Sequence, residues 1–202
     1  MTTTPRVRLD PEARREQLLE LGVRLFARVS LDELSIEKLA EAAGISRGLL
    51  YHYFGNKRDF HRAVVRKAAD ELIAVTAPST GSDPMTRMIG SLERYVDYVE
   101  ANREGYVSLV KGAAGGNEDL AEIYEEARAA LTDRIFLTST TEELAEVGLV
   151  DSPPVRLVIR GWSAMVEAMV LTWLDDPAVM TKQQLLTTCT LALPACVGTL
   201  GI

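Results

Sequence analysis

The chain has 202 residues, of which 47% are hydrophobic, 25% charged and 6% aromatic, and its formal net charge is −7 at pH 7. This composition can form a buried core and excludes a disordered or fibrous chain, while the length excludes a large multidomain enzyme. Cys189 and Cys196 are too few for a disulfide framework, so we expect a reducing, cytoplasmic setting. No uninterrupted apolar run reaches the ~20 residues that cross a bilayer, and we expect a soluble protein that is not exported.

Charge is distributed unevenly along the chain. Residues 1–67 hold 13 Lys and Arg against 9 Asp and Glu, whereas residues 68–202 hold 9 against 20. Electrostatic attraction acts through a local patch and is screened within about 8–10 Å, so a basic head favours contact with phosphate even in an acidic protein. Chance variation over short stretches explains the same counts, and charge alone does not decide between the two.

Three helices are predicted in the first 55 residues. Apolar residues at helical spacing indicate a helix from Pro11 to Val29, with Asp10 as its N-cap. Ser35 caps a short helix over residues 36–43, which ends at Gly44, and Ser46 caps another that runs to Phe54. Two short helices joined by a Gly-Ile-Ser turn are typical of a helix-turn-helix unit, although an ordinary αα-corner has the same pattern.

The rest of the chain is also predicted to be helical. A helix over residues 56–75 is followed by a loop rich in Pro, Ser and Gly at 77–84, and later helices are expected at about 85–101, 104–111, 118–138, 154–174 and 181–200. The predicted fold class is therefore all-α, with about nine helices. We expect a helix-turn-helix domain at 1–55, a connecting helix at 56–77 and a second domain at 78–202.

The most specific pattern lies between Ser35 and Phe60. It combines the small core of Ile36, Leu39, Ala40 and Ala43, the turn Gly44-Ile45-Ser46, the run Leu50-Tyr51-His52-Tyr53-Phe54, and Lys57 at the next helix start. Several fixed offsets agree at once, and the segment resembles the DNA-binding region of the tetracycline-repressor (TetR) family of transcriptional regulators. Leu49 departs from the pattern, since the family often has Thr or a small residue there. Beyond Ala77 the resemblance is one of architecture only.

This resemblance implies which residues meet DNA. The third helix would enter the major groove with Arg47 on a guanine, Gly48 allowing close approach, and Leu49 either against a thymine methyl or supporting the helix. Contacts to the phosphate backbone would come from helix N-termini and exposed polar side chains: Ser35, Ser46, Tyr51, His52 and Lys57. Lys38, Arg6 and Arg8 are weaker candidates, and the last two belong to an N-terminal arm.

The last two predicted helices carry broad apolar stripes. One stripe consists of Val158, Gly161, Trp162, Met165, Ala168, Met169 and Trp173, and the other of Leu185, Leu186, Leu191, Leu193 and Val197. A helix-turn-helix protein binds palindromic half-sites as a dimer, and the family usually dimerises through this helix pair, so we expect a homodimer there. The same stripes would also close a monomer core. Pro194 is expected to kink the last helix.

A small-molecule site is expected in the second domain from the same resemblance. Its candidate lining is aromatic and flexible apolar surface: Met88, Tyr95, Tyr98, Tyr106, Phe136, Trp162, Met165 and Met169. Residues 112–117, with Gly115 and Gly116, are the expected hinge or rim. The implied function is a regulator, with repression the commoner mode, that binds a palindromic operator and is released by a small apolar or amphipathic effector.

Other functions stay open at this point. Both histidines, His52 and His61, lie in the head, the cysteines on the last helix look buried, and no phosphate-binding loop is present. We therefore expect no enzyme, no cofactor and no metal. An all-α enzyme that uses acidic residues, for example Glu143 or Glu167, and a regulator controlled by a protein partner are the alternatives.

Overall fold

The structure, a computed structural model, describes residues 10–79 and 83–201. Within these residues all the regular secondary structure is helical. Arg6 and Arg8 of the N-terminal arm lie outside the described residues. Ten helices are found in the described ranges: α1 (Pro11–Phe26), α2 (Ile36–Ala43), α3 (Arg47–Phe54), α4 (Lys57–Val75), α5 (Pro84–Ala101), α6 (Arg103–Ala114), α7 (Glu118–Leu137), α8 (Thr141–Glu146), α9 (Pro153–Asp175) and α10 (Lys182–Gly198). The all-α prediction is confirmed.

Local side-chain chemistry sets the helix starts in the head. The Ser35 hydroxyl accepts a hydrogen bond from the N–H of Lys38 at 3.1 Å, and that of Ser46 accepts one from the N–H of Leu49 at 3.3 Å. These bonds satisfy N–H groups that have no partner within the first turn of a helix. Gly44 ends α2 in the left-handed conformation, with φ +64°, as glycine most readily does. The predicted first helix is three residues too long, since α1 ends at Phe26.

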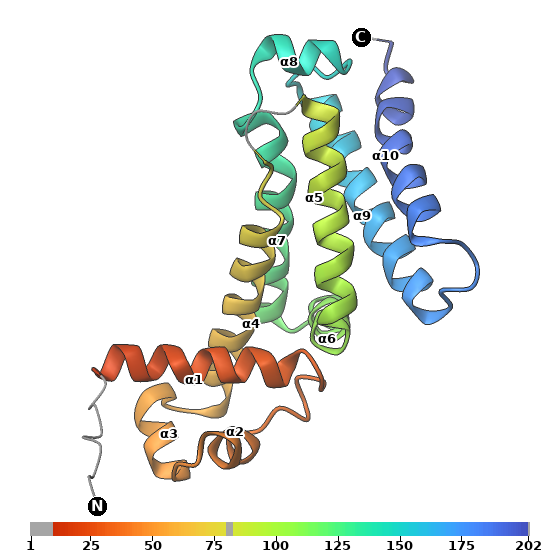
Figure 1. Cartoon of the computed structure of the whole chain (residues 1–202). Helices are drawn as coiled ribbons and strands as arrows, with labels where there is room; N and C mark the ends of the chain where they lie inside the picture. Colours follow the sequence, from red (N-terminus) through yellow and green to blue (C-terminus); the bar gives the residue numbers. More distant parts are fainter. Residues whose placement is uncertain (1–9, 80–82, 202) are drawn as a thin grey trace, which may run out of the picture.

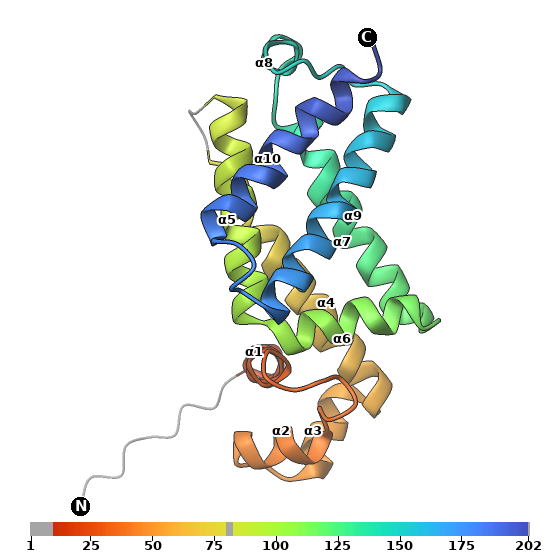
Figure 2. The ribbon, with the colours of Figure 1, turned by 90° about the vertical axis from the view of Figure 1, so that its right-hand side faces the viewer.

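The helices form a small head and a longer bundle. Figure 1 shows α1 lying across the base of the bundle with α2 and α3 beneath it, while α4 runs from the head up alongside α7. Turned by 90°, the molecule shows α6 close above α1 (Figure 2). In the bundle α9 packs against α10, and both pack against α5. The head therefore reaches the bundle through α4 and through the contact of α1 with α6.

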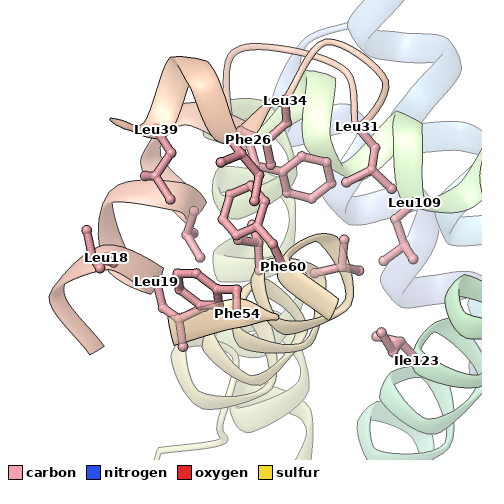
Figure 3. Packing of buried hydrophobic residues seen from close by; sticks show 14 of the residues in the cluster. Leu18, Leu19, Phe26, Leu31, Leu34, Leu39, Phe54, Phe60, Leu109 and Ile123 are labelled. Carbon is pink, nitrogen blue, oxygen red and sulfur yellow. The ribbon is translucent and has the colours of Figure 1, made fainter. Parts of the chain in front are cut away.

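A hydrophobic core runs from the head into the base of the bundle. Phe54 and Phe60 meet with ring centroids 5.2 Å apart, and Phe60 is fully buried. Leu109 of α6 and Ile123 of α7 pack into the same cluster from the other side (Figure 3). Because the head and the bundle share this core, a shift of α6 or α7 is transmitted to α1 and α4 by direct packing.

Two sequence expectations in the bundle are wrong. The helix α8 was not predicted, although Thr140 and Glu143 form a capping box at its start that the sequence displays. Gly112 was expected to be a break, but α6 continues through it to Ala114. A β-carbon at Gly112 would collide with the side chain of Leu120, so glycine is used there to let α7 pack closely against α6.

The last two helices differ from expectation in one further respect. Cys189 is buried, as predicted, but Cys196 is exposed. By its length and composition alone, α9 is long and apolar enough to cross a membrane. Core helices of soluble proteins pass the same test, and α9 packs against α5, α7 and α10, so this single helix is a weak indication of membrane insertion.

Candidate nucleic-acid interface and internal cavity

One face of α3 is free of the core. Leu50 and Phe54 point inward and are buried, which leaves Arg47, Leu49 and Tyr51 exposed. The remaining α3 candidates, Gly48 and His52, are also exposed, as is Lys57 at the start of α4. The predicted base and phosphate contacts thus share an accessible surface, which we call the α3 face: Arg47, Gly48, Leu49, Tyr51 and His52.

A carboxylate of α2, that of Glu37, lies next to the arginine of the α3 face. Arg47 Nη1 lies 3.4 Å from Glu37 Oε1, and both side chains are largely exposed. Hydrogen bonds from the Glu37 backbone N–H and from the Ser35 hydroxyl, together with the Arg47 charge, lower the pKa of Glu37. Glu37 is therefore ionised at neutral pH, and a contact of Arg47 with a base or phosphate would have to replace this carboxylate. An exposed pair of this kind is weak, so the exchange costs little.

Much of the head's excess positive charge faces the bundle. Arg58 Nε lies 2.5 Å from Asp119 Oδ2, and Arg62 Nη2 lies 2.7 Å from Glu122 Oε2, while Arg66 pairs with Glu126. These three pairs form a ladder between α4 and α7. The positive charges of α4 that contribute to the imbalance seen in the sequence therefore form ion pairs with acidic side chains of α7 in the same molecule.

A cavity of about 200 Å³ lies inside the bundle. It is larger than an engineered cavity of ~150 Å³ that holds benzene. All the helices from α4 to α7 contribute to its walls, and α1, α9 and α10 close it. Five of the eight residues predicted for a ligand site line it: Met88, Tyr95, Tyr98, Tyr106 and Trp162.

The other three predicted residues lie elsewhere. Phe136 packs beneath the guanidinium of Arg156, whose Cζ is 4.5 Å from the ring centroid, and Met169 packs against the core of α5, α9 and α10. Met165 is half-buried on α9 and does not line the cavity. Residues 112–117, the expected rim, do not line it either. Helical spacing identifies a buried face but not which neighbour covers it, and this is why the three were misplaced.

A half-buried polar network lines part of the cavity. Tyr106 and Tyr124 donate hydrogen bonds to the two carboxylate oxygens of Glu167, at 2.7 and 2.8 Å. The hydroxyls of Tyr95 and Tyr106 are 2.8 Å apart, and since Tyr106 gives its proton to Glu167, Tyr95 donates to Tyr106. Burial raises the pKa of Tyr95 and Tyr106 and raises that of Tyr124 to about 12, so all three stay protonated at neutral pH. The network provides hydroxyl groups that could pair with a polar group of a bound molecule.

Sequence reasoning assigned only Phe136 of α7 to the ligand site, whereas the structure lines the cavity with other residues of this helix and its C-cap. These residues are Tyr124, Ala127, Arg128, Leu131, Thr132, Arg134, Ile135 and Thr138. Most of them follow helical spacing. Their mixed polarity is not typical of an apolar ligand site, although Tyr124 is an aromatic candidate of the same kind as Tyr95 and Tyr98.

The outer surfaces of α9 and α10 carry a continuous uncharged stripe. On α9 the exposed residues include Leu157, Gly161 and Ala168, and on α10 they include Leu191 and Ala195. The other stripe residues predicted for a dimer contact are buried or half-buried in the monomer, namely Val158, Trp162, Met165, Met169, Trp173, Leu185, Leu186, Leu193 and Val197. The predicted stripe thus divides into a core side and a smaller free side.

Comparison with known proteins identifies two matching family models. Residues 18–64 match the N-terminal model described as bacterial regulatory proteins, tetR family, and residues 84–193 match a tetracyclin repressor-like C-terminal domain.

No group of three or more His, Cys, Asp or Glu side chains that could hold a metal ion occurs within residues 10–79 and 83–201.

Similar proteins include both a transcriptional activator and a transcriptional repressor. The HTH-type transcriptional activator FasR of Mycolicibacterium smegmatis is 27% identical over 177 residues, covering 87% of this chain and 78% of that protein. The HTH-type transcriptional repressor Rv1474c of Mycobacterium tuberculosis is 28% identical over 123 residues, covering 61% of this chain and 65% of the relative. A crystal structure of a tetR-family transcriptional regulator from Streptomyces coelicolor superposes with a TM-score of 0.78 at 29% identity, covering 93% of this chain and 82% of that one.

Proposed function

Since this chain belongs to the tetR family of bacterial regulatory proteins, and is thus a DNA-binding transcriptional regulator and not an enzyme, we propose that it is a cytoplasmic repressor. In this proposal it binds a palindromic operator as a homodimer, and a small apolar or amphipathic effector releases it. The observation that carries the proposal is the coexistence of an accessible α3 face with a cavity that reaches the helix joining it to the bundle. Named repressors among the relatives favour repression, whereas FasR is a named activator.

The α3 face is proposed to read the operator. Arg47 is free to form a bidentate contact with guanine once it leaves Glu37, and Gly48 presents no side chain between the helix and the groove. Tyr51, His52 and Lys57 surround this point with donors for phosphate oxygens. Ser35 and Ser46 both use their hydroxyls as acceptors for backbone N–H groups. The Ser46 hydroxyl proton is left available for a phosphate, whereas the Ser35 hydroxyl also donates to Glu37 and would have to leave that carboxylate first.

Dimerisation is proposed through the uncharged outer faces of α9 and α10. Leu191 and Leu157 are 61% and 71% exposed, which is high for leucine in a soluble monomer. Gly161 and Ala168 on α9 are small enough to let a second helix approach closely. Two copies joined here would place two α3 faces on one side of the molecule, as half-sites ~34–36 Å apart require.

Release by an effector is proposed to act through α4. This helix begins in the head, lines the cavity with Ala68, Ala69 and Leu72, and packs against both α1 and α7. A ligand that fits one position of α4 better than another shifts the spacing of the two heads by its difference in affinity. Couplings of this kind amount to ~1–3 kcal/mol.

Selection of bound fragments from random or genomic DNA tests this function, and we expect a palindrome to be recovered. Arg47→Ala should weaken binding to that fragment by ~1–3 kcal/mol because it removes a base contact. Tyr51→Ala should also weaken it, through the lost phosphate contact. Both variants should keep a nearly unchanged melting temperature, because each side chain is exposed.

Arg103→Ala is the matched control, since Arg103 is an exposed arginine on α6 that pairs with Asp175 and lies away from the α3 face. It should bind the operator like the parent chain. Failure to recover any palindrome, or equal affinity for the Arg47 and Arg103 variants, would remove the proposed reading of DNA.

A further inference from the structure

The end of the cavity away from the head has a different chemistry from the rest. Its walls include Arg87 of α5, Arg134 of α7 and Ser139, which follows α7. We call these three residues the distal end; it lies where α5 begins and α7 ends, opposite α1 in Figure 1. The remaining cavity surface is mostly apolar. A charge that is removed from water without a counter-ion raises the free energy of the folded protein. The arginines of the distal end therefore call for negatively charged partners.

At the distal end, Arg134 has no carboxylate partner among the residues that the structure describes. It donates two hydrogen bonds through Nη1, to the carbonyl oxygen of Ile73 at 3.2 Å and to Thr76 Oγ1 at 3.0 Å. Both acceptors are uncharged and belong to the C-terminal turn of α4 and its cap. Its Nε and Nη2 have no acceptor among the residues that the structure describes, so most of the guanidinium's donor capacity is unused.

The surrounding charges increase this imbalance. Burial and the positive charge of Arg94 lower the pKa of Arg134 to about 10, which still leaves it protonated at neutral pH. Arg87 is different, because its Nη1 lies 2.9 Å from Glu143 Oε1, and Asp83 also acts on it. Glu143 is thus already engaged by Arg87, and in the described ranges no carboxylate forms an ion pair with Arg134.

The shape of the cavity points to the rest of the ligand. Its α7 wall extends from Tyr124 to Thr138, which is about 21 Å along a helix axis. Leu72, Leu92, Leu131 and Ile135 line its course with apolar surface. An apolar cavity wall of this length suits an extended alkyl chain better than a compact ring system.

We propose that the effector is an amphipathic anion, whose carboxylate or similar acid group binds Arg134 and whose alkyl chain fills the cavity. This inference rests on the proposed effector-binding function and adds the chemical class of the ligand. A carboxylate can take a paired hydrogen bond from the Nε and Nη2 atoms of one guanidinium, the two donors that Arg134 leaves unused.

The location of Arg134 also connects the acid group to DNA binding. Its two existing hydrogen bonds hold the C-terminal end of α4, the helix that starts in the head. An anion bound to Arg134 pulls on the same guanidinium and weakens or reorients that grip. Occupation of the distal end therefore acts directly on the helix that positions the α3 face.

The test uses three probes of equal chain length: decanoate, decan-1-ol and decylammonium. Binding to the purified full chain is measured by calorimetry without DNA, and release of the selected operator fragment is measured separately. We expect decanoate to bind about tenfold or more tightly than decan-1-ol, as one charge-assisted contact implies. Arg134→Gln should remove this preference and leave decan-1-ol affinity nearly unchanged, while Arg134→Lys should keep part of it.

Two further variants separate the distal end from other arginines. Arg128→Gln alters another arginine that lines the cavity, whose guanidinium donates to Ser163 Oγ and to the carbonyl oxygen of Arg160. Arg103→Gln alters an exposed arginine outside the cavity. Both should retain the preference for decanoate.

Three binding results with the parent chain would overturn the assignment: equal affinity for decanoate and decan-1-ol, a preference for decylammonium, or no binding of any probe. Two results with the variants would also overturn it. These are an Arg134→Gln chain that keeps the preference for decanoate, and a loss of that preference in Arg128→Gln instead of Arg134→Gln. If decan-1-ol binds and releases DNA as well as decanoate does, the effector proposal stands and only the acid group is wrong. If the chain binds no operator at all, the regulatory proposal fails whatever the probes do.

Discussion

His61 shows how a single side chain ties the head together. Its Nε2 lies 2.6 Å from the carbonyl oxygen of Leu34, so α4 holds the segment that leads into α2. Burial is the main cause that lowers the pKa of His61, and the positive charge of Lys57 adds to it, while the Leu34 carbonyl and Asp32 oppose the shift. His61 is therefore neutral in the folded protein at neutral pH, with Nε2–H as the donor.

This shift predicts a loss of stability in mild acid. With a folded pKa below the unfolded value of ~6.5, the unfolded chain binds the proton first, so the free energy of unfolding falls as pH drops below ~6.5 toward the folded pKa. His61→Gln should flatten that part of the profile, measured by urea unfolding between neutral pH and mild acid. His52→Gln, at the exposed histidine of α3, should keep the dependence of the parent chain; an unchanged profile for His61→Gln would assign it to other groups.

Among elements, the contact of α1 with α6 brings the backbones of the head and the bundle close together. A β-carbon added at Gly105 of α6 would lie 2.7 Å from the carbonyl oxygen of Phe26 and 2.9 Å from its ring. Close to this contact, the N–H of Leu31, in the segment that follows α1, donates to Ser108 Oγ of α6 at 2.9 Å. Gly105 and Phe26 also line the cavity. This contact is thus a second route, besides α4, from the cavity to the head.

Gly105→Ala should destabilise the protein by ~1–3 kcal/mol, because backbone on the α1 side cannot yield as a flexible side chain can. Chemical denaturation gives the measurement. Gly90→Ala is the control, since the nearest atom to a β-carbon there is the mobile Arg94 guanidinium at 3.2 Å, and alanine is the better helix former. If the two variants are equally stable, α6 does not rest on α1 as closely as the structure has it.

At the scale of the whole molecule, the proposed function requires a second copy of the chain. One α3 face reads too few base pairs for useful specificity, and the buried side of the α9 and α10 stripes is already used by the monomer core. The uncharged outer side is left for the partner. This division explains why α9 carries apolar residues around most of its circumference.

Leu191→Glu should convert the dimer to a monomer and weaken operator binding by at least about tenfold, because it places a charge in the proposed contact. Sedimentation velocity and operator titration measure the two effects. Leu137→Glu introduces the same charge at an 80% exposed leucine of α7, outside this stripe, and should change neither. A Leu191→Glu chain that remains dimeric would place the interface on another surface.

The head could be predicted from sequence almost completely. Ser35, Gly44 and Ser46 fix the ends of α2 and α3 by bonds within a few residues, and such bonds form whatever lies elsewhere in the chain. The helix α8 carried an equally local signal in Thr140 and Glu143 and was within reach of the same reasoning. The domain division at residues 55–78 stays a prediction.

The bundle could be predicted only as a set of helices. Local periodicity determined that the chain is all-α and where most helices begin and end, because hydrogen bonds and caps within a helix join near neighbours. The tertiary structure alone decided that Arg134 holds α4 without a carboxylate and that Glu167 meets tyrosines of α6 and α7. It also decided that most of each apolar stripe is buried or half-buried in the monomer. These relations join residues dozens of positions apart, and only packing, which places one helix face against another, determines them.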